Sequence, residues 1–339
     1  MAPEPDRIQL AQLPTPLVQL SRLNEELDGA RIWMKRDDLT GLEVSGNKIR
    51  KLEYILADAC FAGQDTIVTE GTSQSNHCRA TAAACAKAGL KALLLFRPEA
   101  DGVPQGNHLL DVLFGAETRS YSRVRFDADH DQIVNDVLAE LIATGRNPRY
   151  TPMGASEPLG CWGYIRAAAE LAEQLRAVDI ERCDLVVPIS SGGTCAGLLL
   201  GLLLHGLEHV TLWAVPVSDD IPYHKRVVSR LCREAIESFQ LPIELDESRL
   251  QFIDGYVGAG YGIPTPAAIA TLQHVARAEG IVLDPVYTAK AFCAVLDAVR
   301  EGRWGREHPV VFVQTGGIFS NFAWPERVLR GMDSDRSAR

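Results

Sequence analysis

Short apolar runs alternate with helical patterns from about residue 46 onward, and this alternation is the strongest constraint on the fold. The predicted strands are 65–70, 91–96, 118–122, 184–189, 210–217 and 309–315. The predicted helices are 48–63, 75–90, 107–117, 129–145, 159–175, 193–206, 264–280 and 286–302. Strands separated by helices form parallel βαβ units, so we predict an α/β fold whose sheets are mostly parallel and flanked by helices.

The overall composition excludes several classes of protein. A net charge of −10 argues against binding to nucleic acid or to an anionic membrane. No apolar stretch reaches the roughly 18 residues of a membrane span, and the first ten residues lack a secretory pattern. The eight cysteines are scattered, without a CxxC pair or zinc-ligand spacing. We therefore predict a cytoplasmic protein with reduced cysteines and no metal.

The turn "PISSGGTCAG" (188–197) joins a predicted buried strand to a helix. Its small residues, Ser191, Gly192, Gly193 and Thr194, let backbone N–H groups converge at a helix N-terminus, which is a typical phosphate site. The turn has neither the lysine of a Walker loop nor a GxGxxG pattern. A plain glycine turn explains the same residues, so both interpretations stay open.

Two further turns follow strands. In "TEGTSQSNHCRA" (69–80), five polar residues from Ser73 to His77 crowd a helix start where one capping residue is enough, which indicates a ligand. In "VQTGGIFSNF" (313–322), Thr315 precedes two glycines that permit close approach of a ligand. Ligands of parallel sheets bind at the carboxyl ends of strands, where all three turns lie.

The segment "VSGNKIRKLE" (44–53) brings Lys48 and Lys51 onto one face at a helix start, where the helix dipole disfavours cations. A solvated charged face is one explanation. The other is a reactive lysine beside a phosphate, as in a Schiff base with pyridoxal phosphate, because such a lysine must shed its proton to attack a carbonyl.

Six motifs in order make the chain resemble the D-cysteine desulfhydrase and 1-aminocyclopropane-1-carboxylate deaminase family of pyridoxal-phosphate enzymes. The motifs are "KRDDLTGLEVSGNKIRKLEYILADA", "QSNHCRATAAA", "SSGGTCAG", "GYGIPTP", "LDPVYTAKA" and "TGGIFSNF". The resemblance runs from about Pro14 to about Pro325. It implies the two-domain fold type II, usually dimeric, with a large cofactor-binding domain at 1–51 plus 161–330. A small inserted domain would occupy 52–160, and 331–339 would be a flexible tail.

The resemblance also implies roles for individual residues. Lys48 would hold the cofactor as an internal aldimine, and Asn76 would bond the cofactor's 3'-oxygen. Ser75 would contact the substrate and assist proton movement, with Asn76 and His77 at the substrate carboxylate. Lys51, Ser191, Gly192, Gly193 and Thr194 match the phosphate site, and Tyr261 and Tyr287 match two active-site tyrosines.

Two positions separate the branches of this family. The deaminase branch has a glutamate and a leucine (in "LGG") where this chain has Thr288 and Thr315, which match the desulfhydrase branch. By analogy both lie near the pyridine nitrogen, where hydroxyls keep it less firmly protonated than a glutamate does, and this suits loss of a good β leaving group. The resemblance thus implies β-elimination from a 3-substituted alanine, foremost D-cysteine, to pyruvate, hydrogen sulfide and ammonia.

Alternatives remain open from the sequence. Thr72 and Ser73 replace more typical family residues, and Arg97 is a cation that could favour an anionic β-substituent, so an L-cysteate sulfo-lyase is one alternative. A 1-aminocyclopropane-1-carboxylate deaminase, a racemase and a β-replacement synthase are others. A non-catalytic binding module and a nucleotide-binding enzyme without this cofactor represent other classes.

Overall fold

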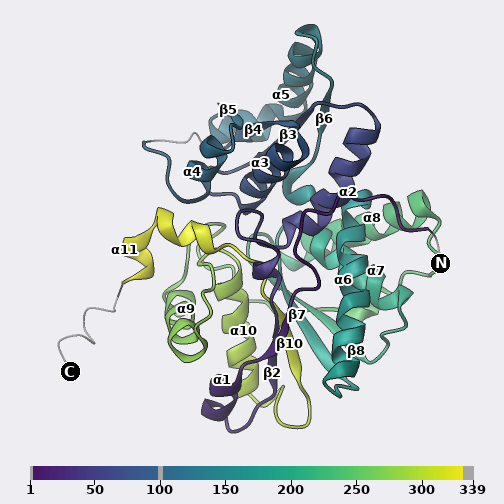
Figure 1. The fold of residues 1–339 in the computed structure, drawn as a ribbon. Helices are drawn as coiled ribbons and strands as arrows, with labels where there is room; N and C mark the ends of the chain where they lie inside the picture. The colour runs from purple at the N-terminus through teal and green to yellow at the C-terminus, as the bar shows by residue number, and fades with distance from the viewer. Residues whose placement is uncertain (1–2, 98–101, 331–339) are drawn as a thin grey trace.

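Two sheets, each covered by helices on both faces, make up the computed structural model, which describes residues 3–97 and 102–330 (Figure 1). The larger sheet has the order β1 (Leu17–Gln19), β2 (Ile32–Lys35), β10 (Val310–Val313), β7 (Cys183–Ile189), β8 (Val210–Pro216), β9 (Leu250–Phe252). Only β1 runs antiparallel to its neighbour, β2. The smaller sheet is parallel throughout, in the order β5 (Glu117–Ser120), β4 (Lys91–Phe96), β3 (Thr66–Gly71), β6 (Pro148–Tyr150). The predicted α/β class is therefore confirmed.

Apolar side chains on both faces of each sheet explain the layers, since buried parallel strands need cover on both sides. On the large sheet, one face packs on α6 (Pro158–Ala177), α7 (Gly193–Leu204) and α8 (Ile221–Phe239). The other face packs on α1 (Ser21–Glu26), α9 (Pro266–Glu279) and α10 (Thr288–Arg300). On the small sheet, α2 (Lys48–Phe61) and α3 (Asn76–Ala88) cover one face and α5 (Arg123–Ala143) the other. The remaining helices are α4 (Gly106–Leu113) and α11 (Pro325–Val328).

All eight predicted helices are present, although their ends differ from the prediction. The structure also contains helices that were not predicted. The predicted helix at 129–145 is the later part of α5, which starts at Arg123 and has non-helical dihedral angles at Asp129 (φ −118°, ψ 23°). Helix α8 was missed, although Val228, Leu231, Cys232 and Ala235 are buried at helical spacing. The strands β1, β2, β6 and β9 were also missed, because three or four residues are too few to show a period. The boundaries of the two predicted domains remain a prediction.

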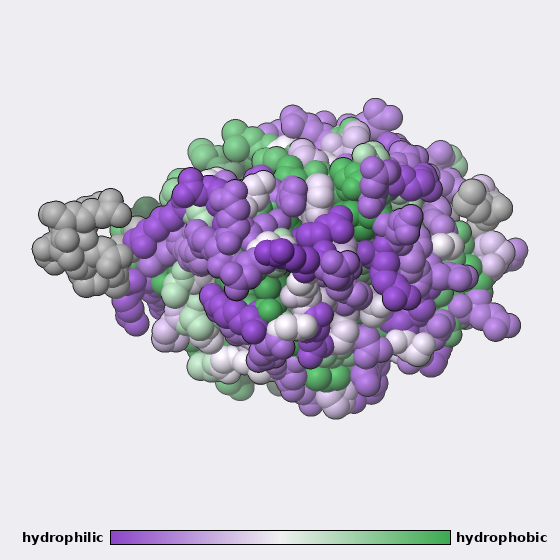
Figure 2. Space-filling model, turned by 90° about the horizontal axis from the view of Figure 1, so that it is seen from below, coloured by the Kyte–Doolittle hydropathy of each residue, from purple (hydrophilic) through white to green (hydrophobic). Residues whose placement is uncertain are grey.

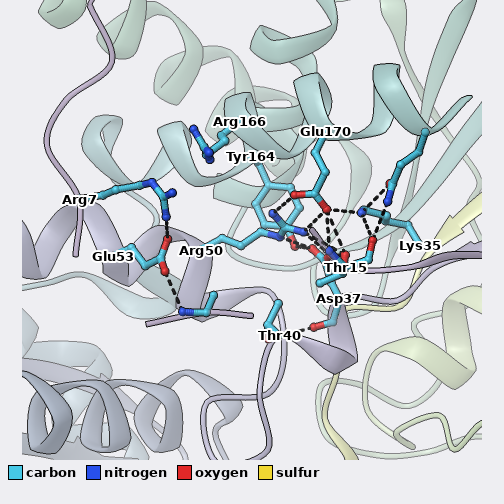
Figure 3. Close-up of polar contacts among 12 residues, drawn as sticks. Arg7, Thr15, Lys35, Asp37, Thr40, Arg50, Glu53, Tyr164, Arg166 and Glu170 are labelled. Carbon is cyan, nitrogen blue, oxygen red and sulfur yellow. Dashed lines mark hydrogen bonds and ion pairs between the residues drawn. The ribbon is translucent and has the colours of Figure 1, made fainter. Parts of the chain in front are cut away.

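A buried group of charges ties α2 to α6 and to the segment around β2 (Figure 3). Arg50 donates to Asp37 Oδ1 and Oδ2 at 2.8 and 2.9 Å and to both carboxylate oxygens of Glu170 at 3.0 Å. Tyr164 donates to Asp37 Oδ2 at 2.5 Å, and Lys35 pairs with Glu170. Because Arg50 belongs to the first turn of α2, this network fixes the turn that begins with Lys48.

One face of the molecule is mainly polar (Figure 2). The face in Figure 2 is mostly hydrophilic, with hydrophobic residues in small separate groups. Within the described residues, no helix has the length and apolar character needed to cross a membrane. All eight cysteines are free thiols, and Cys60 is the exposed one.

Candidate active site

A pocket at the carboxyl end of the large sheet brings together residues that are far apart in the sequence. Seven of the predicted site residues line it: Lys48, Asn76, Ser191, Gly192, Thr194, Tyr287 and Thr315. Asn47, Pro188, Ile189, Ser190 and Cys195 complete the lining. The predicted strand-to-helix turns at 69–80, 188–197 and 313–322 therefore meet at one place, as expected for a parallel sheet.

The half-buried Lys48 is the first residue of α2, and its amine enters this pocket. Its Nζ donates to Asn47 Oδ1 at 2.9 Å, while Asn47 Nδ2 donates to Thr194 Oγ1 at 2.9 Å. Burial lowers the pKa of Lys48 to about 8; Asp284 opposes this shift, and Arg79 adds to it. A substantial fraction of the amine is therefore neutral near physiological pH, as a nucleophile or base requires.

Lys51 lies one turn further along α2 and is fully buried. Its Nζ donates to the carbonyl of Gly154 at 3.1 Å and is so close to Gly193 that a Cβ there would meet it at 2.9 Å. Burial lowers the pKa of Lys51 well below its usual value, and the neighbouring charge of Lys48 lowers it further. The solvated-face explanation of these lysines is therefore wrong, because both amines lie at the pocket and its glycine turn.

The N-terminus of α7 forms the other side of the glycine turn. Gly192 is the N-cap with φ +83°, a conformation that favours glycine, and α7 begins at Gly193. Ser156 accepts a hydrogen bond from Gly193 N at 3.2 Å and donates to Ser191 Oγ at 2.8 Å. Two lysine amines and the N-terminus of α7 thus lie close together, although the chain as a whole has a net charge of −10. A phosphate bound there would balance their local positive charge. These residues fit the phosphate group of the cofactor.

The loop from Gly71 to Ser75 and the start of α3 form a third side. Ser75 is the N-cap of α3, with its Oγ accepting from Cys78 N at 3.2 Å, and it is 6% exposed. The first-turn N–H groups of a helix have no partner inside the helix and suit an anionic group such as a carboxylate. The His77 ring turns inward to Thr69 Oγ1 at 2.8 Å, and burial and the nearby lysines lower its pKa well below the usual value. His77 therefore does not present a charged ring to the pocket.

Tyr261 and Tyr287 meet at their hydroxyl groups, which are hydrogen-bonded, with the ring centroids 5.8 Å apart. Burial raises the pKa of both phenols, that of Tyr287 well above its usual value. Lys290 of α10 holds the glycine-rich loop that contains Tyr261, because its Nζ donates to the carbonyls of Val257 and Gly260 at 2.7 and 3.0 Å. The pair is therefore protonated at neutral pH and able to donate.

The two threonines that separate the family branches lie in different places. Thr315 lines the pocket, and its carbonyl accepts from Asn47 N at 3.1 Å. Thr288 is fully buried behind the pocket, where its hydroxyl donates to Asp284 Oδ1 at 2.8 Å. Asp284 also accepts from the backbone N–H groups of Val286, Tyr287 and Thr288 at 2.9, 3.1 and 2.7 Å. Thr288 thus orders the start of α10 through Asp284.

Arg97 does not lie at the pocket. Its guanidinium pairs with Asp127 at 2.7 Å and lies over the ring of Phe126, 5.1 Å from the ring centroid. The sequence suggested this cation as a feature that favours an anionic substrate, and the structure directs it toward α5 instead.

Among the residues in or next to the pocket that the sequence reasoning missed are Asn47, Asn107, Ser156 and Asp284. Asn47 and Asp284 lie inside the motifs "SGNK" and "LDPVY", next to residues that were selected, so a closer examination of those motifs could have found them. Asn107 and Ser156 lie in segments without a chemical signature, and only the tertiary structure brings them to the site.

Comparisons with known proteins agree with this geometry. Residues 8–316 match the family model described as "Pyridoxal-phosphate dependent enzyme". The chain is 37% identical to a D-cysteine desulfhydrase of Serratia proteamaculans over 95% of this chain and 97% of the relative. It is 38% identical to a protein of Pyrococcus abyssi that is provisionally named a 1-aminocyclopropane-1-carboxylate deaminase, over 95% of both chains. A solved structure described as an ACC deaminase homologue superposes with a TM-score of 0.85 at 36% identity, covering 96% of both chains.

Proposed function

This chain belongs to the family of pyridoxal-phosphate dependent enzymes, and from that premise we propose that it is a lyase for β-elimination from D-cysteine. The products would be pyruvate, hydrogen sulfide and ammonia. The observation that supports this most strongly is the Lys48 amine, with its pKa lowered to about 8, beside the glycine turn at 191–194. The same observation argues against a binding module without catalysis, which needs no reactive amine.

The cofactor, when bound, supplies an aldehyde for amines and a ring that withdraws electrons from the substrate's Cα. In our proposal the N-terminus of α7 and Lys51 hold its phosphate, and Asn76 donates to its ring oxygen. Lys48 would be the residue that joins its aldehyde, because its amine has the lowered pKa. Gly193, Ser191 and Ser156 would supply backbone and hydroxyl groups to its phosphate.

Two groups are suited to move the Cα proton. The Lys48 amine accepts a proton readily because its pKa lies close to working pH. The hydroxyl of Ser75 already accepts from Cys78 N, so its own hydrogen is free to point at the substrate. The handedness of the substrate decides which of the two faces the Cα–H bond.

Tyr287, at the pocket, is the proposed donor to the departing sulfur. Its raised pKa keeps the proton on the oxygen until the leaving group takes it. Tyr261 then replaces that proton through their hydrogen bond, and Tyr261, which is 38% exposed, regains its own proton from solvent. The first-turn N–H groups of α3 hold the substrate carboxylate in this proposal.

Three observations favour D-cysteine over other substrates. Thr315 lines the pocket where a deaminase of this family would have a leucine. Arg97 is paired with Asp127 away from the pocket, which removes the main reason to expect a cysteate substrate. A relative covering nearly the whole chain is named D-cysteine desulfhydrase. L-cysteate sulfo-lyase and 1-aminocyclopropane-1-carboxylate deaminase are the alternatives.

The test is a keto-acid release assay with D-cysteine, L-cysteine, L-cysteate, 3-chloro-D-alanine and aminocyclopropane carboxylate, and with Lys48→Ala as the inactive control. We expect pyruvate and sulfide from D-cysteine. Release of 2-oxobutyrate from the cyclopropane alone would overturn the choice of substrate in favour of the deaminase. Pyruvate and sulfite from L-cysteate alone would identify a sulfo-lyase.

A homodimer is part of the proposal. It is supported by the family resemblance and by apolar side chains that remain exposed around η1 (Asp37–Leu39), where Leu39 is 44% and Leu42 is 77% exposed. Light scattering coupled to gel filtration should give twice the mass of the 37.1 kDa chain. A Leu42→Glu variant should shift that mass toward the monomer.

A further inference from the structure

The amide of Asn76 faces the pocket, and its two ends have opposite chemistry. An amide nitrogen donates a hydrogen bond to a ligand, whereas an amide oxygen only accepts. Asn107 Nδ2 donates to Asn76 Oδ1 at 2.8 Å. Asn76 Nδ2 is then the free end of the amide. It lies beside Gly317, where a Cβ atom built on Gly317 would be 3.0 Å from it. Asn76 therefore presents a donor because Asn107 occupies its acceptor.

The orientation of Asn107 is fixed by two neighbours that cannot change roles. Arg79 Nε donates to Asn107 Oδ1 at 3.2 Å, and a guanidinium has no acceptor. Asn107 Nδ2 donates to the carbonyl of Gln74 at 3.0 Å, and a carbonyl has no donor. Reversing the Asn107 amide would thus oppose donor to donor at Arg79 and acceptor to acceptor at Gln74.

Arg79 is itself immobilised. Its Nη1 and Nη2 donate to the carbonyls of Glu43 and Ser45, both at 2.7 Å, and its guanidinium lies 5.2 Å from the ring centroid of Phe319. The side chain is fully buried. Burial lowers the pKa of Arg79 to about 10, against the opposing effect of Asp111, so the group stays charged at neutral pH.

We propose that Arg79 and Asn107 are positioning residues that set the polarity of the Asn76 amide, so that it offers an N–H group to the ring oxygen of the cofactor. The inference rests on the proposed function, because it assumes that pyridoxal phosphate occupies the pocket. Neither residue lines the pocket, and α3 and α4 hold them behind it. The N–H bond stabilises negative charge on the ring oxygen and strengthens cofactor binding.

Asn107→Asp removes the donor to Asn76, together with the bond to the carbonyl of Gln74. The new carboxylate keeps the shape of the side chain and pairs with Arg79, so the fold should be retained. It cannot donate to Asn76 Oδ1, and the Asn76 amide is expected to reverse and turn its oxygen to the pocket. Loss of a hydrogen bond to a charged group should raise the Kd for pyridoxal phosphate about tenfold or more. The pH at which the visible absorption band of the bound cofactor is half changed should rise by about one unit.

A double-mutant cycle with Asn76→Ala separates this role from a general structural one. Once Asn76 is alanine, Asn107→Asp should change the Kd by less than about threefold, because the two effects share one hydrogen bond. The matched control is Asn24→Asp, which makes the same change at a buried asparagine whose Oδ1 accepts from Ile32 N at 2.9 Å in the large sheet, and it should leave the Kd unchanged.

The outcomes are distinct. A wild-type protein that takes up no pyridoxal phosphate would overturn the proposed function and this inference with it. Suppose instead that the wild-type protein binds the cofactor. An unchanged Kd in Asn107→Asp, or additive effects in the cycle, would then overturn only the proposed positioning of Asn76 by Arg79 and Asn107.

Discussion

Lys51 Nζ lies where a Cβ atom on Gly193 would meet it at 2.9 Å. The amine thus occupies the space that a side chain at the start of α7 would need, and Ser156 Oγ, 2.7 Å from the same position, closes the other side. The cation and the helix N-terminus are in contact because residue 193 has no side chain.

Gly193→Ala should weaken cofactor binding. The methyl group must displace Lys51 or Ser156. Overpacking of this kind typically costs about 1–3 kcal/mol, which corresponds to about 5- to 150-fold in Kd. Equilibrium dialysis against pyridoxal phosphate gives the Kd. Gly305→Ala is the matched control, since nothing lies within 4 Å of a Cβ at that position. Equal Kd values for the two variants would show that the contact of residue 193 with Lys51 and Ser156 does not affect cofactor binding.

The rate at which the cofactor-free protein captures pyridoxal phosphate should depend on pH. Only the neutral Lys48 amine attacks an aldehyde, and its pKa is lowered to about 8. The rate constant should therefore rise with pH up to about that value and level off above it, as seen by stopped-flow absorbance. Asp284→Asn should move the midpoint down, because Asp284 raises the pKa of Lys48. A rate that still climbs steeply near the ordinary lysine pKa of 10.5 would contradict a lowered value.

Lys290→Met should reduce turnover more than cofactor binding. The loop carbonyls of Val257 and Gly260 lose their donor, so Tyr261 is no longer held against Tyr287, while the residues that surround the phosphate are untouched. We expect kcat/KM to fall about tenfold or more, with faster proteolysis in the loop and little change in Kd. Lys225→Met, a change of a lysine near Phe252, is the control. Unchanged proteolysis would show that Lys290 does not restrain the loop.

The buried charges of Figure 3 should make the protein sensitive to acid. Burial alone raises the pKa of Asp37, but Arg50 and Lys35 more than offset this, and the net pKa lies below 3.8; that of Glu170 is likewise lowered from 4.5. Carboxylates with a lowered folded pKa stabilise the fold above their unfolded pKa, and this stability is lost as pH falls through the folded values. Denaturant midpoints should therefore drop as the pH decreases below about 4.5.

Asp37→Asn tests that network. It leaves Arg50 buried with one partner fewer, and breaking a buried pair costs about 3–5 kcal/mol of unfolding free energy. The variant should also show a shallower loss of stability in acid. Glu140→Gln removes a surface partner of Arg119 and should have little effect. A comparable midpoint for the two variants would contradict the energetic role of Asp37.

The sequence was sufficient for the parts of the site that have a local signature. The turn at 191–194 and the capped start of α3 at Ser75 each combine a strand end with small or polar residues. The lysines at 48 and 51 share one face at a helix start. Parallel topology then brings such turns together without further information.

The sequence was insufficient where a residue acts through a distant partner. Asn107 reaches Asn76 across 31 positions of the chain. This pairing has no period or motif, because side-chain hydrogen bonds between elements depend on how the helices pack.

The position of β10 in the large sheet has a consequence for biosynthesis. This strand lies between β2 and β7, although it is made almost 300 residues after β2 begins. Until β10 is synthesised, β2 and β7 have unpaired edges where β10 will lie, and the pocket lacks Thr315. The binding site for pyridoxal phosphate is therefore complete only when translation is nearly finished. C-terminal truncations before residue 310 should yield chains that aggregate and bind no coloured cofactor.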